Sequence, residues 1–151
     1  MAVNNIIKRI QNIMRQDAGI NGDAQRIEQM TWMFFLKVYD TQEETWEYKD
    51  ENYKSIIPED LRWRKWAVDE KDGEALTGEA LLSFVNEKLF PTLKNLPIDA
   101  NTPRAKSIVL ETFADLNQYM KNGTLLRQVV NIVNEIEFDD ADDRHTFGDI
   151  Y

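Results

Sequence analysis

The stretch from Ala24 to Asp40, AQRIEQMTWMFFLKVYD, is the feature that most constrains the fold of this chain. Apolar residues recur in it at helical spacing, and Trp32, Phe35 and Leu36 fill the positions between them. A helix that is apolar on nearly every side has to be surrounded by protein or by lipid. Its apolar centre, Met30 to Leu36, is far shorter than the roughly 20 residues that cross a bilayer. We therefore expect residues 24–40 to form the central helix of a helical domain.

Other periodic segments predict further helices, each with apolar residues on one face and boundary residues typical of helix ends. Besides residues 24–40, the predicted helices are residues 3–16, 58–66 and 78–90, one starting at 102–103 and one starting at 123–124. Asp23 is the predicted N-cap of the central helix, and Pro91 is predicted to end or kink the helix before it. Alternation of apolar and polar residues is scarce, so we expect an all-α fold: a single helical bundle with little or no sheet.

The composition is that of an ordinary globular protein. A length of 151 residues suggests one domain, and 42% apolar with 30% charged residues does not fit a disordered chain. The absence of cysteine excludes a disulfide scaffold, a thiolate metal site and a thiol nucleophile. Lys8 and Arg9 interrupt what would be the apolar part of a signal peptide. We expect a cytoplasmic protein that does not enter a membrane.

The last residues suggest that residues 1–151 are a piece of a longer protein. After the acidic segment 135–143, Phe147, Ile150 and Tyr151 begin a new apolar stripe. Natural domains seldom end inside a forming amphipathic element. We therefore interpret the chain as a helical domain cut from a longer protein, whose sequence would continue after Tyr151.

No residue pattern predicts chemistry in this chain. There is no Gly-x-Gly, and hence no dinucleotide fingerprint or phosphate-cradling loop. His145 is the single histidine, which makes a histidine metal cluster impossible and a histidine-dependent triad unsupported. The acidic residues from Asp139 to Asp143 lack the glycine and the closing glutamate of a calcium loop. We expect no catalytic, cofactor-binding or metal-binding residues here.

The charge is negative overall but uneven along the chain. The net charge of −9 argues against a protein that coats a phosphate backbone by itself. Residues 1–37 nevertheless carry five cationic and three acidic side chains, whereas residues 135–151 carry seven acidic side chains against one arginine. One end could thus face nucleic acid while the other faces solvent or a basic partner. Lys8, Arg9 and Arg15 are the first group of candidate DNA contacts.

A second group lies in the segment Arg62-Trp63-Arg64-Lys65-Trp66. Its cations and indoles could pair with phosphates and stack on bases. The alternative is a short helix that packs Trp63 and Trp66 against the core and leaves Arg62, Arg64 and Lys65 in water. We favour the alternative. The two interpretations are nevertheless compatible, since buried tryptophans would present the cations outward.

Three segments together resemble one known family. They are GDAQRIEQMTWMFFLKVYD at residues 22–40, IPEDLRWRKW at residues 57–66 and LLRQVVNIVNEIEFDDADDRHTFGDIY at residues 125–151. In this order, over nearly the whole chain, the sequence resembles the helical N-terminal domain of the methyltransferase (M) subunit of bacterial type I restriction–modification systems. The third segment is similar to the family's passage from its last bundle helix to a Gly-Asp-x-Tyr element that leads into the catalytic domain.

The resemblance implies an activity that this chain does not carry by itself. The full M subunit transfers a methyl group from S-adenosylmethionine to adenine N6 in DNA, with a glycine-rich cofactor motif and an Asn-Pro-Pro-aromatic motif. Neither motif occurs here, and a flipped adenine needs such a pocket. The cofactor is therefore expected for the full-length protein only. The implied partners are a DNA-specificity subunit, a second M subunit, a motor-nuclease subunit and double-stranded DNA.

Two interpretations of the function follow. The first is a non-catalytic domain that helps the methyltransferase clasp DNA and contacts the specificity subunit and the neighbouring M subunit. The second is a free-standing acidic helical module for protein interaction, whose acidic end docks a basic partner. An acidic mimic of DNA is disfavoured, because 18 basic residues are spread among the 27 acidic ones.

Overall fold

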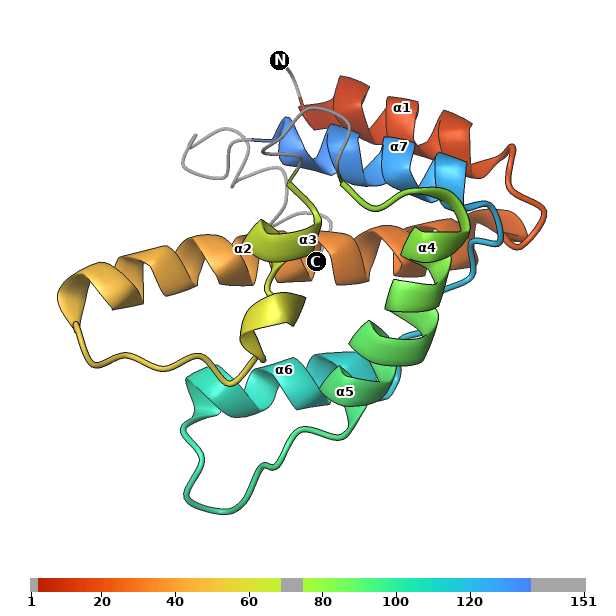
Figure 1. Cartoon of the computed structure of the whole chain (residues 1–151). Helices are drawn as coiled ribbons and strands as arrows, with labels where there is room; N and C mark the ends of the chain where they lie inside the picture. The colour runs from red at the N-terminus through yellow and green to blue at the C-terminus, as the bar shows by residue number, and fades with distance from the viewer. Residues whose placement is uncertain (1–2, 69–74, 137–151) are drawn as a thin grey trace.

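Figure 1 shows a computed structural model of the chain, which describes residues 3–68 and 75–136. The helical elements in chain order are α1 (Val3–Met14), α2 (Gly22–Lys49), the 3-10 turn η1 (Glu59–Leu61), α3 (Trp63–Trp66), α4 (Gly78–Ser83), the π-helical segment η2 (Phe84–Leu89), α5 (Phe90–Lys94), α6 (Arg104–Ala114) and α7 (Gly123–Asn134). No strand occurs within the described ranges, which confirms the all-α prediction.

The longest helix, α2, is the centre of the bundle, as the sequence predicted. The pair α1 and α7 lies along one side of it, and α5 with α6 lies on the other (Figure 1). Trp32 and Met33 are fully buried, and Phe34 and Leu36 are 1% exposed. Trp32 stacks on Trp66 and meets the edge of Phe90, so aromatic rings join α2 to both α3 and α5. In the described residues, no helix is long and apolar enough to span a membrane.

The end of α2 was predicted wrongly. The helix continues nine residues past Asp40 to Lys49, through the polar sequence TQEETWEYK. These residues carry no apolar stripe, and periodicity therefore gave no signal for them. Within them Glu43 is completely buried, where Arg62 from a distant segment offsets its charge. Tertiary pairing, and not the local pattern, extends the helix.

Two smaller boundary predictions also need correction. Asn21, with an extended backbone, is the N-cap of α2, and Asp23 lies in the first turn, where its charge favours the positive end of the helix and pairs with Arg26. The helical backbone also continues past Pro91 to Lys94, so the proline does not end the helix, and a kink there stays a prediction. The wider π-helical turn of η2 precedes the proline, which then falls in the first turn of α5, where a missing N–H costs little.

The start of α7 packs closely on the start of α4. A Cβ atom added to Gly123 would lie 1.9 Å from the carbonyl oxygen of Gly78, so only glycine fits at this crossing. Asn122 caps α7 by accepting a hydrogen bond from the backbone N–H of Leu125 at 3.0 Å. The predicted start at 123–124 is thereby confirmed, and the crossing places the turn after α1 next to both helix starts.

Candidate functional site

The outer face of α1 is basic and polar. Asn5, Lys8 and Asn12 of α1, and Arg15 directly after its last residue, follow one another at intervals of three and four residues, and all four are exposed. Lys8 and Arg15, seven residues apart, lie about 10 Å apart along the helix axis. No acidic residue occurs in α1, and its opposite face is buried through Ile6, Ile10 and Met14. We call the four exposed residues the α1 face.

The cations of this helix differ in their ion pairs. Arg9 pairs with Glu135 at the end of α7, with 2.8 Å between Nη1 and Oε2, and both side chains are nearly half exposed. Arg15 donates a hydrogen bond to the Asn12 side chain at 3.0 Å. Neither Lys8 nor Arg15 has a carboxylate partner among the described residues. The α1 face therefore presents net positive charge on a chain that is acidic as a whole.

The second group of candidates is arranged quite differently. Arg62 is only 7% exposed and forms ion pairs with four carboxylates. These carboxylates are Asp40, Glu43 and Glu47 of α2 and Glu59 of η1. Trp63 and Trp66 are buried, which confirms the interpretation of a core-facing pair. The expectation that the cations beside them all point into water is wrong for Arg62, because the carboxylates of α2 draw it inward.

Arg64 and Lys65 also meet carboxylates. Arg64 Nε lies 2.8 Å from Asp40 Oδ1, and its Nη1 lies 3.0 Å from Glu47 Oε2. Lys65, half exposed, lies 3.4 Å from Glu59. Because the charge of this segment is offset by its own neighbours, DNA contact through Arg62, Arg64 or Lys65 stays a prediction without geometric support.

The electrostatics of this network are those of a structural joint. Hydrogen bonds from Arg62 lower the pKa of Glu47 and of Glu59, and the same carboxylates raise the pKa of Arg62 in spite of its burial. Burial raises the pKa of Tyr39 to about 12, with the charge of Glu43 adding to the effect. These shifts move the pKa values of the groups further from pH 7, whereas proton transfer near pH 7 requires pKa values close to it.

Acid is expected to weaken this joint. The pKa of Glu47 and of Glu59 is lowered from the ordinary value of 4.5, so the stability from their pairs is complete above about pH 4.5 and is lost as the pH falls through the lowered values. Urea unfolding followed between about pH 5 and pH 3 measures the loss. A Glu47→Gln variant cannot titrate at this position and should lose stability less steeply. Parallel curves for the two proteins would contradict the assignment.

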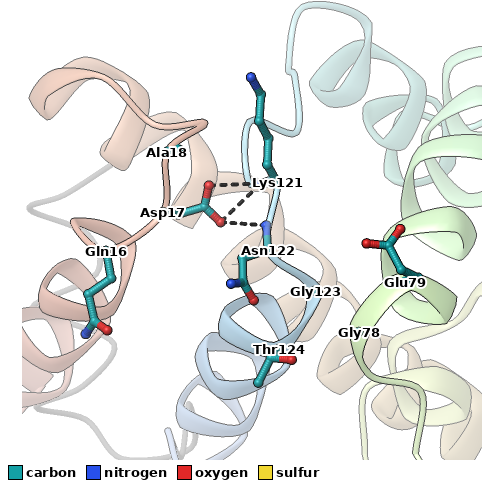
Figure 2. A pocket seen from close by; sticks show the side chains of 9 residues that line it. All are labelled: Gln16, Asp17, Ala18, Gly78, Glu79, Lys121, Asn122, Gly123 and Thr124. Carbon is teal, nitrogen blue, oxygen red and sulfur yellow. Dashed lines mark hydrogen bonds between the residues drawn. The ribbon is translucent and has the colours of Figure 1, made fainter.

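A polar pocket of about 550 Å³ lies where the turn after α1 meets the starts of α4 and α7. Figure 2 shows Asp17, Lys121 and Asn122 in its wall. Asp17 is 3% exposed, and its carboxylate accepts hydrogen bonds from the backbone N–H groups of Gly19 at 2.8 Å and of Lys121 and Asn122 at 2.9 Å. Main-chain donors occupy both oxygens of Asp17, so it fastens two chain segments together.

Sequence reasoning missed three polar anchors of the bundle: Asp17, Lys37 and Arg127. The Lys37 ammonium donates to the last two carbonyls of α7, those of Val133 and Asn134, at 2.9 Å each, and to the carbonyl of Ile136 just beyond the helix at 2.6 Å. Arg127 donates to the carbonyls of Trp66, Ala67 and Leu76. The spacing of Asp17 and Gly19 is typical of an Asx turn and could have indicated the first anchor. Nothing local indicates the other two.

Some predictions lie outside the described residues. These are the acidic segment beyond Ile136, His145 and the apolar stripe that ends at Tyr151. Within the described residues, no group of three or more histidine or carboxylate side chains could hold a metal ion.

Comparison with known proteins gives consistent matches. The family model described as HsdM N-terminal domain matches residues 3–133. The type I restriction enzyme EcoEI methylase subunit of Escherichia coli is 54% identical over 153 residues, covering 100% of this chain and 30% of that protein. The chain therefore spans less than a third of that relative.

Two solved structures have the same fold. One is a modification subunit of a putative type I restriction enzyme from Vibrio vulnificus YJ016, with a TM-score of 0.80 and 31% identity, covering 98% of this chain and 33% of that one. The other comes from work on complex assembly and conformational transition of the type I R-M system, with a TM-score of 0.78 and 35% identity, covering 98% of this chain and 28% of that one.

Proposed function

Since this chain belongs to the HsdM N-terminal domain family and is the N-terminal domain of a type I restriction–modification methylase subunit, we propose that it is a non-catalytic domain for clasping DNA and contacting neighbouring subunits. The single observation that carries the DNA part is the α1 face, a basic surface on an acidic chain. The relatives are about three times as long as this chain. Their length supports the first interpretation, a domain of a longer subunit, over a free-standing interaction module.

The activity of the whole protein is part of the same proposal. The full-length subunit would methylate adenine in DNA with S-adenosylmethionine, in the cytoplasm, using residues outside this domain. Its partners would be the DNA-specificity subunit, a second M subunit and the motor-nuclease subunit. The name of the E. coli relative and the subject of the second solved structure support this assignment.

The α1 face suits contact with the sugar–phosphate backbone. Lys8 and Arg15 supply cations, while Asn5 and Asn12 supply amide donors beside them. Such contacts position a protein on DNA without reading its sequence. Arg9 lies beside this face and would join the contact if phosphate replaced Glu135 as its partner. Recognition of a DNA sequence is left to another subunit.

Charge reversal on the α1 face tests the proposal. In the complex with the specificity subunit, Lys8→Glu with Arg15→Glu should weaken binding to all DNA sequences by about the same factor. The slope of log affinity against log salt is negative, and it should become less steep by about 2, since each of the two cations would neutralise one phosphate. Titration of labelled duplexes by fluorescence anisotropy at several salt concentrations measures both effects.

The matched control is Lys49→Glu with Lys54→Glu, which makes the same change in charge at exposed positions on and just after the end of α2. It should leave the salt slope near that of the unchanged protein. Equal slopes for all three proteins would remove the α1 face as a DNA contact. A third variant, Lys65→Glu, tests the second group of candidates at its most exposed cation, and loss of affinity there would add that segment to the DNA surface.

A further inference from the structure

The last nine residues of α2, 41–49, which we call the α2 tip, have little local reason to be helical. Their sequence is polar, and a helix of about two turns is unstable by itself in water. Asp40, Glu43 and Glu47 also stand at intervals of three and four residues and therefore share one side of the helix. Like charges at this spacing oppose helix formation.

Two arginines from another segment offset these carboxylates. Arg62 Nε lies 3.6 Å from Glu43 Oε1, and Arg62 also pairs with Glu47. Arg64 bridges Asp40 and Glu47 at 2.8 and 3.0 Å. The pairs join residues between 15 and 24 positions apart in the sequence. The tip thus receives from the 62–64 segment the positive charge that its own sequence lacks.

Further contacts of the tip come from residues that flank it in the sequence. The Tyr53 hydroxyl donates to Glu43 Oε2 at 2.6 Å, and the Trp46 ring packs against Tyr53 and Tyr39. In Figure 1 the yellow end of α2 extends past the ends of α1 and α7. The buried apolar residues of α2 lie earlier in the helix, between Met30 and Tyr39.

We propose that Arg62 and Arg64 form an ionic latch that keeps the α2 tip helical. Removing their charge releases the tip as a local unit, while α1, α7 and the first part of α2 stay folded. Trp63, Trp66 and Leu61 hold the arginine segment on the bundle by burial, independently of the ion pairs. The latch makes the length of α2, and with it the position of the 92% exposed Tyr48, depend on two side chains.

Hydrogen exchange read by mass spectrometry on the 151-residue chain tests the latch. In Arg62→Met with Arg64→Met, the amides of the α2 tip should exchange at least about tenfold faster, with those of α1 and α7 unchanged, because local opening affects only the released unit. The matched control is Lys65→Met with Lys88→Met. It removes two cations whose partners, Glu59 and Asp60, lie in η1, and it should leave exchange in the tip unchanged.

A charge rescue separates electrostatics from packing. Adding Asp40→Asn, Glu43→Gln and Glu47→Gln to the double methionine variant removes the repulsion and should restore slow exchange in the tip. If the double variant does not fold, Arg64→Met alone should still open the tip selectively, since that side chain is 25% exposed. Three outcomes would each overturn the latch. The first is that amides of the tip still exchange slowly in both the double variant and Arg64→Met. The others are that the rescue variant does not recover slow exchange, or that exchange in Arg64→Met accelerates equally in α1 and in the tip.

Discussion

Asp17→Ala is expected to lower the free energy of unfolding by about 3 kcal/mol, because each of three part-buried donors left without its partner costs about 1 kcal/mol, the low end of the range for buried donors. The substitution orphans backbone N–H groups of Gly19, Lys121 and Asn122. It also frees the turn after α1 from the start of α7. A domain of this size has a total stability of only about 5–15 kcal/mol, so the variant approaches the limit of folding. Urea unfolding followed by circular dichroism measures the loss.

Asp50→Ala is the matched control. The Asp50 side chain also accepts a hydrogen bond from a backbone N–H two residues later, that of Asn52 at 2.9 Å. Because Asp50 is exposed, water can accept this hydrogen bond once the carboxylate is removed. The decrease in its stability should stay below about 1 kcal/mol. Asp17→Asn keeps one acceptor oxygen, so its loss of stability should lie between those of Asp17→Ala and Asp50→Ala. Equal decreases for Asp17→Ala and Asp50→Ala would show that the buried carboxylate does not fasten the two segments.

Trp32→Ala should have a comparable effect in the apolar core, with a loss of about 3–5 kcal/mol from the cavity it leaves. The Trp32 ring is completely buried between Trp66 and Phe90, on elements that approach α2 from different directions. Thermal unfolding followed by circular dichroism gives the magnitude. The change should also loosen α3 and α5, since both pack on this ring.

Two further variants sharpen the result. Trp32→Phe keeps an aromatic ring and removes an indole N–H that has no hydrogen-bond partner among the described residues, so it should lose much less stability than Trp32→Ala. Tyr48→Ala removes an aromatic ring that is 92% exposed and should change stability by no more than about 0.5 kcal/mol. Similar losses for Trp32→Ala and Tyr48→Ala would contradict the placement of Trp32 at the centre of the core.

The parts of the fold that the sequence predicted are those that depend on near neighbours in the chain. The dense apolar run around Trp32 could be satisfied only by burial, and it predicted the central helix. The three-residue spacing of Trp63 and Trp66 predicted that both rings face the core. The polar residues of α1 alternate with buried ones at helical spacing, so the candidate cations Lys8 and Arg15 could be placed on its outer face from sequence.

By itself, the sequence determined the all-α class, the position of the central helix and the resemblance to the type I methyltransferase family, since each follows from patterns within a segment. Only the tertiary structure decided that α2 continues to Lys49 and that Arg62 is a buried partner of carboxylates instead of a surface cation. The physical reason is the same for both. The partners are up to 24 residues apart in the chain, and a local pattern records spacing but not which distant charges meet when the chain folds.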